Sequence, residues 1–270
     1  MEINKIYCEN NLDTMKRMPD NFIDLTVTSP PYDNLRDYKG YSFDFEAIAK
    51  ELYRVTKQGG VVVWVVGDAT INGSETGTSF KQALYFKEIG FNLHDTMIYW
   101  KDSFAFPEQT RYAQNIEYMF VLSKGKPTTT NIIKVPTNVD NRVKSRSHKY
   151  RTKTGDTTPV KYEVGKNTRN MENIWIYNCG LNHSSKDVIA FEHPAIFPER
   201  LAYDHIISWS NEGDLVYDPF MGSGTTAKAA IASGRNYIGS EISEEYCQII
   251  EKRLHPLLNN LFTQEDKTEC

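Results

Sequence analysis

The chain has 270 residues, of which 40% are hydrophobic and 24% are charged, which is globular rather than disordered or fibrous composition. The formal net charge of −4 argues against a uniformly basic nucleic-acid-binding protein. No signal peptide is recognisable and the longest aliphatic run, 61–66, is too short to cross a bilayer, so we expect a cytoplasmic protein without membrane contact. Cys8, Cys179, Cys247 and Cys270 show no Cys-x-x-Cys spacing, which indicates neither a metal site nor a disulfide framework.

Strands and helices alternate in the pattern of apolar residues along most of the chain. The predicted elements are, in chain order, a strand at 22–28, a helix at 43–57, a strand at 61–66, a helix at 79–89, strands at 96–100 and 116–122, a helix at 201–209 that begins near Pro198, a strand at 215–217, a helix at 225–232, a strand at 236–240 and a helix at 243–258. This alternation predicts an α/β fold with a doubly wound, mostly parallel sheet.

The stretch 124–170 interrupts this pattern and is strongly basic, with twelve Lys or Arg against three Asp or Glu. It is rich in Thr, Asn and Ser and lacks apolar periodicity, so long loops are predicted there. We therefore expect a basic, loop-rich insertion at 124–189 within a domain formed by 1–123 and 190–270. A solvated insertion without a role is the alternative, although long loops in compact domains are more often functional.

A glycine-rich motif follows one predicted strand, at the end where ligands gather in doubly wound folds. Residues 218–226 read Asp-Pro-Phe-Met-Gly-Ser-Gly-Thr-Thr, and Gly222 and Gly224 allow the backbone to approach a ligand closely. The motif lacks the lysine of a phosphate-binding Walker A loop. The Asp218 carboxylate suits an ammonium group, and Glu241, after the next strand, is placed like the acid that accepts ribose hydroxyls. Together they predict a site for a nucleoside that carries an amino acid; an ordinary turn with a surface glutamate is the alternative.

A second motif, Ser29-Pro30-Pro31-Tyr32, follows the first predicted long strand. The two prolines hold an extended segment and leave carbonyl groups without local donors. Ser29 and the Pro30 carbonyl could accept hydrogen bonds from an exocyclic amine, and Tyr32 could stack on the ring that carries the amine.

With these motifs in this order, the sequence resembles the amino-methyltransferases of DNA, in the circularly permuted beta group that uses S-adenosylmethionine (AdoMet). The resemblance covers nearly the whole chain except the basic insertion, and it implies a Rossmann-like AdoMet-dependent methyltransferase fold. It implies Ser29, Pro30, Pro31 and Tyr32 as the catalytic motif. Relatives often carry Gly-Asp where this chain has Glu9-Asn10. The cofactor contacts that the resemblance implies are Asn10, His193, Pro194, Phe197, Asp218, Phe220, Gly222, Ser223, Gly224, Thr225 and Glu241.

The implied chemistry concerns cytosine N4 or adenine N6, whose lone pair is delocalised into the ring. Acceptors at Ser29 and Pro30 would draw the amine out of conjugation, on a base flipped out of the duplex and held by Tyr32. Methylation at carbon 5 requires a cysteine nucleophile, familiarly after proline, and here no cysteine follows proline. In this family Ser at position 29 is usual in cytosine-N4 enzymes, so N4 is expected and adenine N6 is the alternative. A catalytically silent DNA-binding relative and an RNA or protein-amine methyltransferase are further alternatives.

The expected partner is duplex DNA, with a cognate restriction endonuclease acting separately, and the protein is expected to be a monomer or homodimer. Two further positions stay open: Glu117, with Arg111 and Asn115, as pocket or surface residues, and Asp68 as a pocket residue or a cap. The basic residues expected to contact DNA are Lys144, Arg146, Lys149, Arg151 and Lys153.

Overall fold

The computed structural model describes residues 1–32, 43–102, 110–137, 145–163, 167–180, 183–193, 195–196 and 198–265. The chain divides into two compact units, a main unit of 1–131 and 173–270 and a second unit of Ile132–Glu172. The second unit is shorter than the insertion expected at 124–189, because the chain returns to the main sheet before residue 189 as β12 (Ile174–Tyr177).

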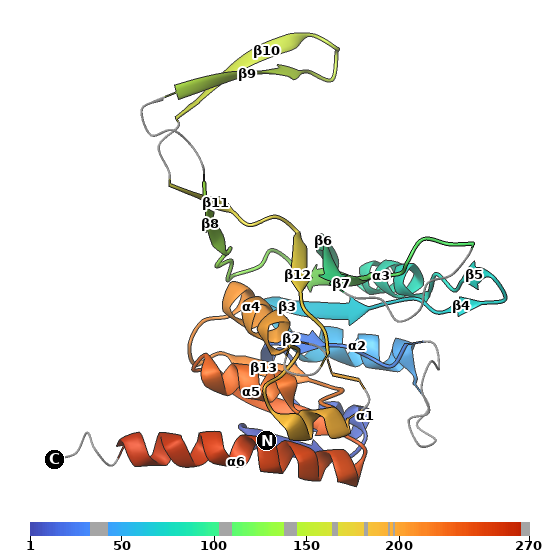
Figure 1. Cartoon of the computed structure of the whole chain (residues 1–270), viewed down its shortest axis with the longest axis vertical. Helices are drawn as coiled ribbons and strands as arrows, with labels where there is room; N and C mark the ends of the chain where they lie inside the picture. Colours follow the sequence, from blue (N-terminus) through green and yellow to red (C-terminus); the bar gives the residue numbers. More distant parts are fainter. Residues whose placement is uncertain are drawn as a thin grey trace. The chain divides into compact units, whose positions relative to one another are not determined.

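The main unit is built on an eight-stranded sheet with the order β1-β14-β13-β2-β3-β7-β6-β12 (Figure 1). The other strands are β1 (Lys5–Cys8), β2 (Ile23–Thr28), β3 (Thr56–Val66), β6 (Asn92–Lys101), β7 (Ile116–Ser123), β13 (Leu215–Asp218) and β14 (Asn236–Glu241). Neighbouring strands are parallel except at β7, which is antiparallel to both β3 and β6. The predicted doubly wound, mostly parallel sheet is confirmed.

Two groups of helices cover the sheet. One group is α1 (Asn11–Arg17), α2 (Phe45–Val55) and α3 (Thr78–Glu88); the other is α4 (Glu199–Trp209), α5 (Thr225–Ala232) and α6 (Glu244–Glu265), preceded by the 3-10 helix η1 (Val188–Glu192). The helix α2 buries Ile48, Leu52 and Val55, the face that its spacing predicts. All six residues of 61–66 are buried, which explains a continuous apolar run instead of an alternating one.

The packing of α3 against the sheet is centred on Trp64 of β3. Trp64 is fully buried, and its ring lies edge-on to Phe86 of α3 with a centroid distance of 5.2 Å. The indole N–H donates to the Gln82 side-chain oxygen at 2.8 Å, so the one polar atom of Trp64 is satisfied inside the core. This packing fixes α3 against the strand that ends just before Gly67 and Asp68.

The second unit contains two antiparallel strand pairs where loops were predicted. One pair is β8 (Lys134–Pro136) with β11 (Thr168–Asn170), and the other is β9 (Ser145–Arg151) with β10 (Thr157–Glu163). The loop between β9 and β10 is closed by a hydrogen bond from the Thr152 N–H to the Asp156 carbonyl at 2.7 Å. The prediction of loops is wrong because solvated strands carry no apolar alternation to reveal them.

The cysteine expectation is corrected as well, since Cys8 at the end of β1 and Cys247 in α6 form a disulfide. The two residues are 239 positions apart, and no local spacing reports such a pair. Among the described residues, no group of His, Cys, Asp and Glu is arranged to hold a metal ion. No helix in the same part of the chain is long and apolar enough to span a membrane.

A short hairpin follows β3 in the main unit, formed by β4 (Thr70–Ile71) and β5 (Ser74–Glu75). Its turn residues, Asn72 and Gly73, both have positive φ, at 51° and 78°. Asn-Gly is the favoured pair for such a turn because both residues tolerate the left-handed region. The hairpin lies between the end of β3 and the start of α3 in the chain.

Candidate active site

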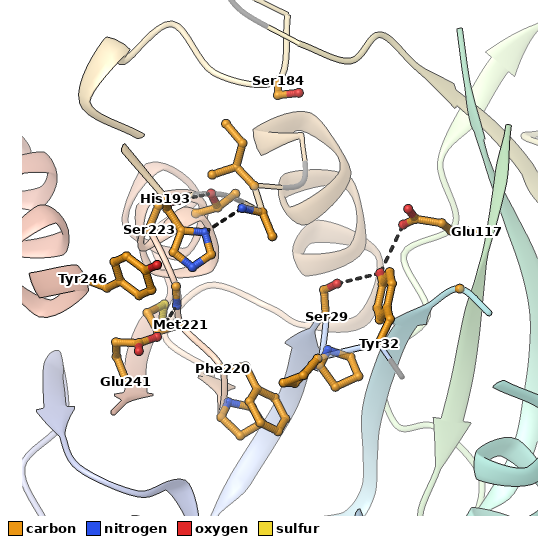
Figure 2. A pocket seen from close by; sticks show the side chains of 18 of the residues that line it. Ser29, Tyr32, Glu117, Ser184, His193, Phe220, Met221, Ser223, Glu241 and Tyr246 are labelled. Atoms are coloured by element: carbon orange, nitrogen blue, oxygen red, sulfur yellow. Dashed lines mark hydrogen bonds between the residues drawn. The ribbon is translucent and has the colours of Figure 1, made fainter. Parts of the chain in front are cut away.

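The chemically distinctive residues converge on one edge of the main sheet. β14, β13, β2 and β3 are parallel neighbours, so their carboxyl ends meet there. β6 also ends at this edge and the antiparallel β7 begins at it. A cavity of about 700 Å³ opens at the edge, and both sequence motifs contribute to its wall (Figure 2).

Glu241 and Tyr246 lie at one end of this cavity (Figure 2), and Gly222 contacts Glu241 there. Its carboxylate accepts hydrogen bonds from the Gly222 and Ser243 N–H groups, each at 2.9 Å. Burial raises the pKa of the Glu241 carboxyl to about 7, although these N–H donors act in the opposite direction. A carboxylate has about four acceptor positions, so this one can still accept from the hydroxyl groups of a ligand.

His193 closes the same end of the cavity over the glycine-rich loop. Its ring meets Tyr246 edge-on, with a centroid distance of 4.3 Å, and its Nδ1 accepts from the Ala195 N–H at 3.1 Å. A Cβ at Gly222 would lie 3.1 Å from the imidazole, and the φ of Gly222 is +54°. Glycine is therefore required at position 222 both for its backbone conformation and for the space that His193 occupies.

Asp218 has a different place from the one predicted, because its carboxylate is buried and does not face the cavity. One oxygen accepts from the Thr28 hydroxyl at 2.6 Å and from the Phe220 N–H at 2.9 Å, and the other accepts from the Thr226 hydroxyl at 2.7 Å. Burial raises the pKa of the carboxyl to about 6, and the same hydrogen bonds lower it. Asp218 thus holds the loop from within, and the loop residues 219–223 and 225 line the cavity.

Asn10 also departs from its expected role. Its side-chain oxygen accepts from the Leu12 N–H at 2.8 Å and caps α1, so it serves the helix instead of the cavity. The neighbouring residues Glu9 and Asn11 line the cavity, and Asn11 donates to the Pro219 carbonyl at 3.1 Å. Glu9-Asn10 stands where relatives carry Gly-Asp, and this difference did not indicate that the two neighbours of Asn10 would line the cavity in its place.

The glycine-rich loop is anchored from α6 by Arg253, whose side chain is fully buried. Its guanidinium donates to the Ser223 carbonyl and to the Ser223 hydroxyl, the latter at 3.0 Å. The same group pairs with Asp187 before η1 and with Glu199 at the start of α4. Lys228 of α5 contacts both acids too, at 2.7 and 2.9 Å, so four segments share one charge network.

The other end of the cavity is formed by Ser29, Pro30, Pro31 and Tyr32. The Ser29 hydroxyl lies 2.8 Å from the Tyr32 hydroxyl, which also lies 3.2 Å from Glu117 at the start of β7 (Figure 2). Polar groups are thus concentrated at this end of the cavity. In Figure 2 Phe220 lies between this end and the Glu241 end, so one continuous space joins the two motifs.

The open positions resolve differently. Glu117 lines the cavity and pairs with Lys101 at 2.9 Å, whereas Arg111 pairs with Glu75 of β5. Asp68 lines the cavity and also caps α3 by accepting from the Ser79 N–H at 2.8 Å, so both of its interpretations hold. Asn115 is not among the described residues that form the cavity wall.

Several predicted residues are found outside the cavity or outside the described chain. Lys149, Arg151 and Lys153 are exposed on the second unit, at the end of β9 and in the loop that follows. Pro194, Phe197 and Lys144 lie outside the described residues, and of Arg146 only the backbone is described.

Sequence reasoning missed many of the lining residues, among them Tyr99, Lys101, Cys179 and Tyr246. In doubly wound folds ligands gather at the carboxyl ends of the strands. Applied to the strand predicted at 96–100, this rule would have found Lys101. No comparable signal marks Cys179, because β12 was not predicted.

A doubly wound sheet with a glycine-rich loop and an acid at adjacent strand ends defines the class of nucleoside-binding α/β proteins. The family model described as DNA methylase matches residues 23–252, and the chain therefore belongs to the DNA methylase family of N6 and N4 amino-methyltransferases. Enzymes of this family take the methyl group from AdoMet.

Individual relatives agree with this assignment. The orphan methyltransferase M.BamHII of Bacillus amyloliquefaciens is 61% identical over 235 residues, which cover 86% of this chain and 88% of the relative. The Type II methyltransferase M.BglII of Bacillus subtilis is 28% identical, and the match covers 96% of this chain and 72% of the relative.

Solved structures share the fold. A protein described as a DNA modification methylase from Thermus thermophilus, solved with AdoMet, has a TM-score of 0.63 at 23% identity, with 94% of this chain and 93% of that chain covered. The cytosine-N4-specific PvuII DNA methyltransferase has a TM-score of 0.66 at 20% identity, with coverage of 96% and 92%.

Arg253→Met should reveal how much the buried charge network stabilises the protein. The substitution keeps an unbranched, largely apolar side chain but leaves Ser223, Asp187 and Glu199 without the guanidinium, so we expect the free energy of unfolding to fall by about 3–5 kcal/mol. Urea titration followed by fluorescence measures this change. Lys252→Met, an exposed neighbour in α6, is the matched control and should change it by less than about 0.5 kcal/mol. Equal effects of the two substitutions would contradict the anchoring role.

Proposed function

We propose that this DNA methylase transfers the methyl group of AdoMet to the exocyclic N4 of a cytosine flipped out of duplex DNA. The observation that carries the proposal is the continuous cavity with Glu241 and Gly222 at one end and Ser29 and Tyr32 at the other. A cofactor bound at the first end and a base bound at the second would be neighbours.

The residues of the first end fit AdoMet. Glu241 offers acceptors for ribose hydroxyls, Tyr246 and Phe220 offer aromatic surface, and the loop at Gly222 brings main-chain groups to the wall. AdoMet, when bound, supplies a methyl group on a positively charged sulfur, which is the electrophile of the reaction. Because the Asp218 carboxylate is buried, the cofactor's ammonium group would meet loop carbonyls or Glu9 instead of Asp218.

The residues of the second end fit an exocyclic amine. The Ser29 hydroxyl and the Pro30 carbonyl can accept the two amine hydrogens, and this withdraws the nitrogen lone pair from conjugation with the ring. Tyr32 and Pro31 form a wall against which the flipped base would pack. Since the amine nitrogen is itself the nucleophile, no covalent intermediate with the protein is required.

The preference for cytosine over adenine rests on Ser29, the residue usual in cytosine-N4 members of the family. Relatives described as Type II methyltransferases support a role beside a separately acting restriction endonuclease. The 61% identical relative is described as an orphan methyltransferase. We therefore propose that the methyl-transfer step itself proceeds without the endonuclease, which acts separately on the same DNA sequence.

The β9–β10 pair is proposed to contact the duplex. Lys149 and Arg151 are two residues apart on β9, so their side chains leave the same face of the ribbon, and Lys153 lies in the loop that follows. All three are exposed. A two-stranded antiparallel ribbon fits the major groove, and three cations on it would contact phosphates.

The reaction product tests the function directly. The purified protein is incubated with methyl-labelled AdoMet and mixed-sequence duplex DNA, the DNA is digested to nucleosides, and the labelled nucleoside is identified by chromatography and mass. We expect N4-methylcytosine, and Ser29→Ala should lower the rate about a hundredfold because one of the two acceptors is lost. N6-methyladenine would show that the target base is adenine and not cytosine, within the same family. The absence of any labelled nucleoside would contradict methyl transfer to DNA.

The raised pKa of Glu241 predicts a pH dependence of cofactor binding. Below its pKa of about 7 the carboxyl is protonated in the free protein and offers fewer acceptors to ribose hydroxyls. AdoMet should therefore bind more weakly as the pH falls from about 8 to about 6, and Glu241→Gln should remove most of this dependence. Calorimetric titration across this range measures it. Glu212→Gln, an exposed control, should keep the wild-type profile; a flat wild-type profile would argue against Glu241 as the ribose acceptor.

The role of the β9–β10 pair is tested by the salt dependence of DNA affinity. Replacing Lys149, Arg151 and Lys153 by Gln should reduce the slope of log affinity against log salt by roughly 0.9 per lost charge, about 3 in total. Fluorescence anisotropy with a labelled duplex measures this slope. The matched control replaces three exposed lysines of the main unit, Lys81, Lys87 and Lys252. Equal slopes for the two triple variants would exclude the β9–β10 pair as the principal phosphate contact.

A further inference from the structure

We propose that Glu117 is a positioning residue that acts through Tyr32 to present the Ser29 hydroxyl as a hydrogen-bond acceptor toward the substrate amine. The inference rests on the proposed role of Ser29 and deepens it. It assigns to Glu117 a part in the reaction that neither sequence motif contains.

Three strand ends bring the participating groups together, and Figure 2 shows Ser29, Tyr32 and Glu117 of this set. Ser29 and Tyr32 follow β2, Glu117 lies near the start of β7, and Lys101 is the last residue of β6. Tyr99 and Glu117 are directly opposite in the β6–β7 register. Lys101 comes two residues after Tyr99 on β6, just past the last pair of that register. The groups therefore meet because of the sheet topology and not because of closeness in sequence.

The directions of the hydrogen bonds follow from counting protons. The Tyr32 hydroxyl lies 3.2 Å from the Val65 carbonyl oxygen and 3.2 Å from a Glu117 oxygen, and both of these oxygens only accept. We infer that the single phenolic proton goes to the Glu117 carboxylate, which as an anion is the strongest of the three acceptors within reach. Either hydroxyl could donate in the 2.8 Å contact between Tyr32 and Ser29, and with the phenolic proton on Glu117 the donor there is Ser29.

This direction matters at the substrate amine. A serine hydroxyl has one proton and two lone pairs, so a hydroxyl that donates to Tyr32 offers only lone pairs to other groups. Those lone pairs can accept an amine hydrogen. If the hydroxyl proton instead pointed at the amine nitrogen, it would engage the lone pair that must act as the nucleophile. The Tyr32 and Glu117 contacts select the productive orientation before the base arrives.

Lys101 sets the orientation of the Glu117 carboxylate. Its ammonium donates to one carboxylate oxygen at 2.9 Å, and the other oxygen is the one that faces Tyr32. Both side chains are largely buried, with 26% of Lys101 and 17% of Glu117 exposed. In such a setting an ion pair is less screened than on the surface and holds its geometry better.

Glu117→Gln reverses the direction of the hydrogen bond between Tyr32 and residue 117 and hardly changes the shape of the side chain. Lys101 still requires an acceptor, so the amide oxygen faces Lys101 and the amide NH2 faces Tyr32. The NH2 then donates to the phenolic oxygen and competes with Ser29 for its acceptor position. Ser29 loses its fixed direction, although the base and cofactor ends of the cavity keep their walls.

The test is a double-mutant cycle of Glu117→Gln and Tyr32→Phe, with single-turnover methyl transfer measured at saturating DNA and AdoMet. The wild type must first yield a labelled methylated nucleoside; if it does not, the proposed function fails before the inference is reached. We expect Glu117→Gln to lower the rate about tenfold and to leave the AdoMet affinity unchanged, because misplacement of one catalytic group acts on the chemical step. In the Tyr32→Phe background the same substitution should cost nothing further.

The cycle separates action through Tyr32 from direct contact with the base. A full additional loss from Glu117→Gln in the Tyr32→Phe background would overturn the inference, since Glu117 would then act without the phenol. An unchanged rate for Glu117→Gln alone, with an active wild type, would overturn it as well. Glu75, an acid of the β4–β5 hairpin, pairs with Arg111 as Glu117 pairs with Lys101. Glu75→Gln is the matched control and should keep the wild-type rate.

Discussion

The buried carboxylate of Asp218 joins the two halves of the active site. It accepts hydrogen bonds from Thr28, the last residue of β2, and from Thr226, in the first turn of α5. Thr28 directly precedes the Ser29-Pro30-Pro31-Tyr32 motif and Asp218 begins the glycine-rich loop, so these bonds fix one motif against the other. A buried carboxylate is costly unless it is hydrogen-bonded, and the three donors here satisfy it at the point where two strands end together.

The arrangement of the sheet could be predicted because its strands carry strong local signals. The run at 61–66 and the helical face of 45–55 are apolar for reasons of burial alone, and both are found where expected. The edge elements β1, α1 and β12 were missed, since short half-exposed segments show little periodicity. The strand pair β9–β10 was missed as well, because most of its residues are polar and its few apolar residues form no sustained alternation.

The candidate site was predictable as a set of motifs but not as a set of contacts. Gly222, Ser29 and Glu241 line the cavity as their positions at strand ends indicated. Which way a side chain turns depends on its neighbours across the sheet, and these are distant in sequence. Asp218 therefore turned inward to Thr28, Asn10 turned to its own helix, and Glu117 turned to Tyr32.

Thr28 and Asp218 are 190 positions apart in the chain, and this separation has a consequence for synthesis. Residues 29–32 leave the ribosome before the loop at Gly222, the acid Glu241 and the anchoring Arg253. A nascent chain that already contains Ser29 and Tyr32 has no second half of the cavity against which to order them. A chain that ends before residue 218 therefore lacks the partner carboxylate of Thr28, and one that ends before residue 253 lacks the anchor of the glycine-rich loop.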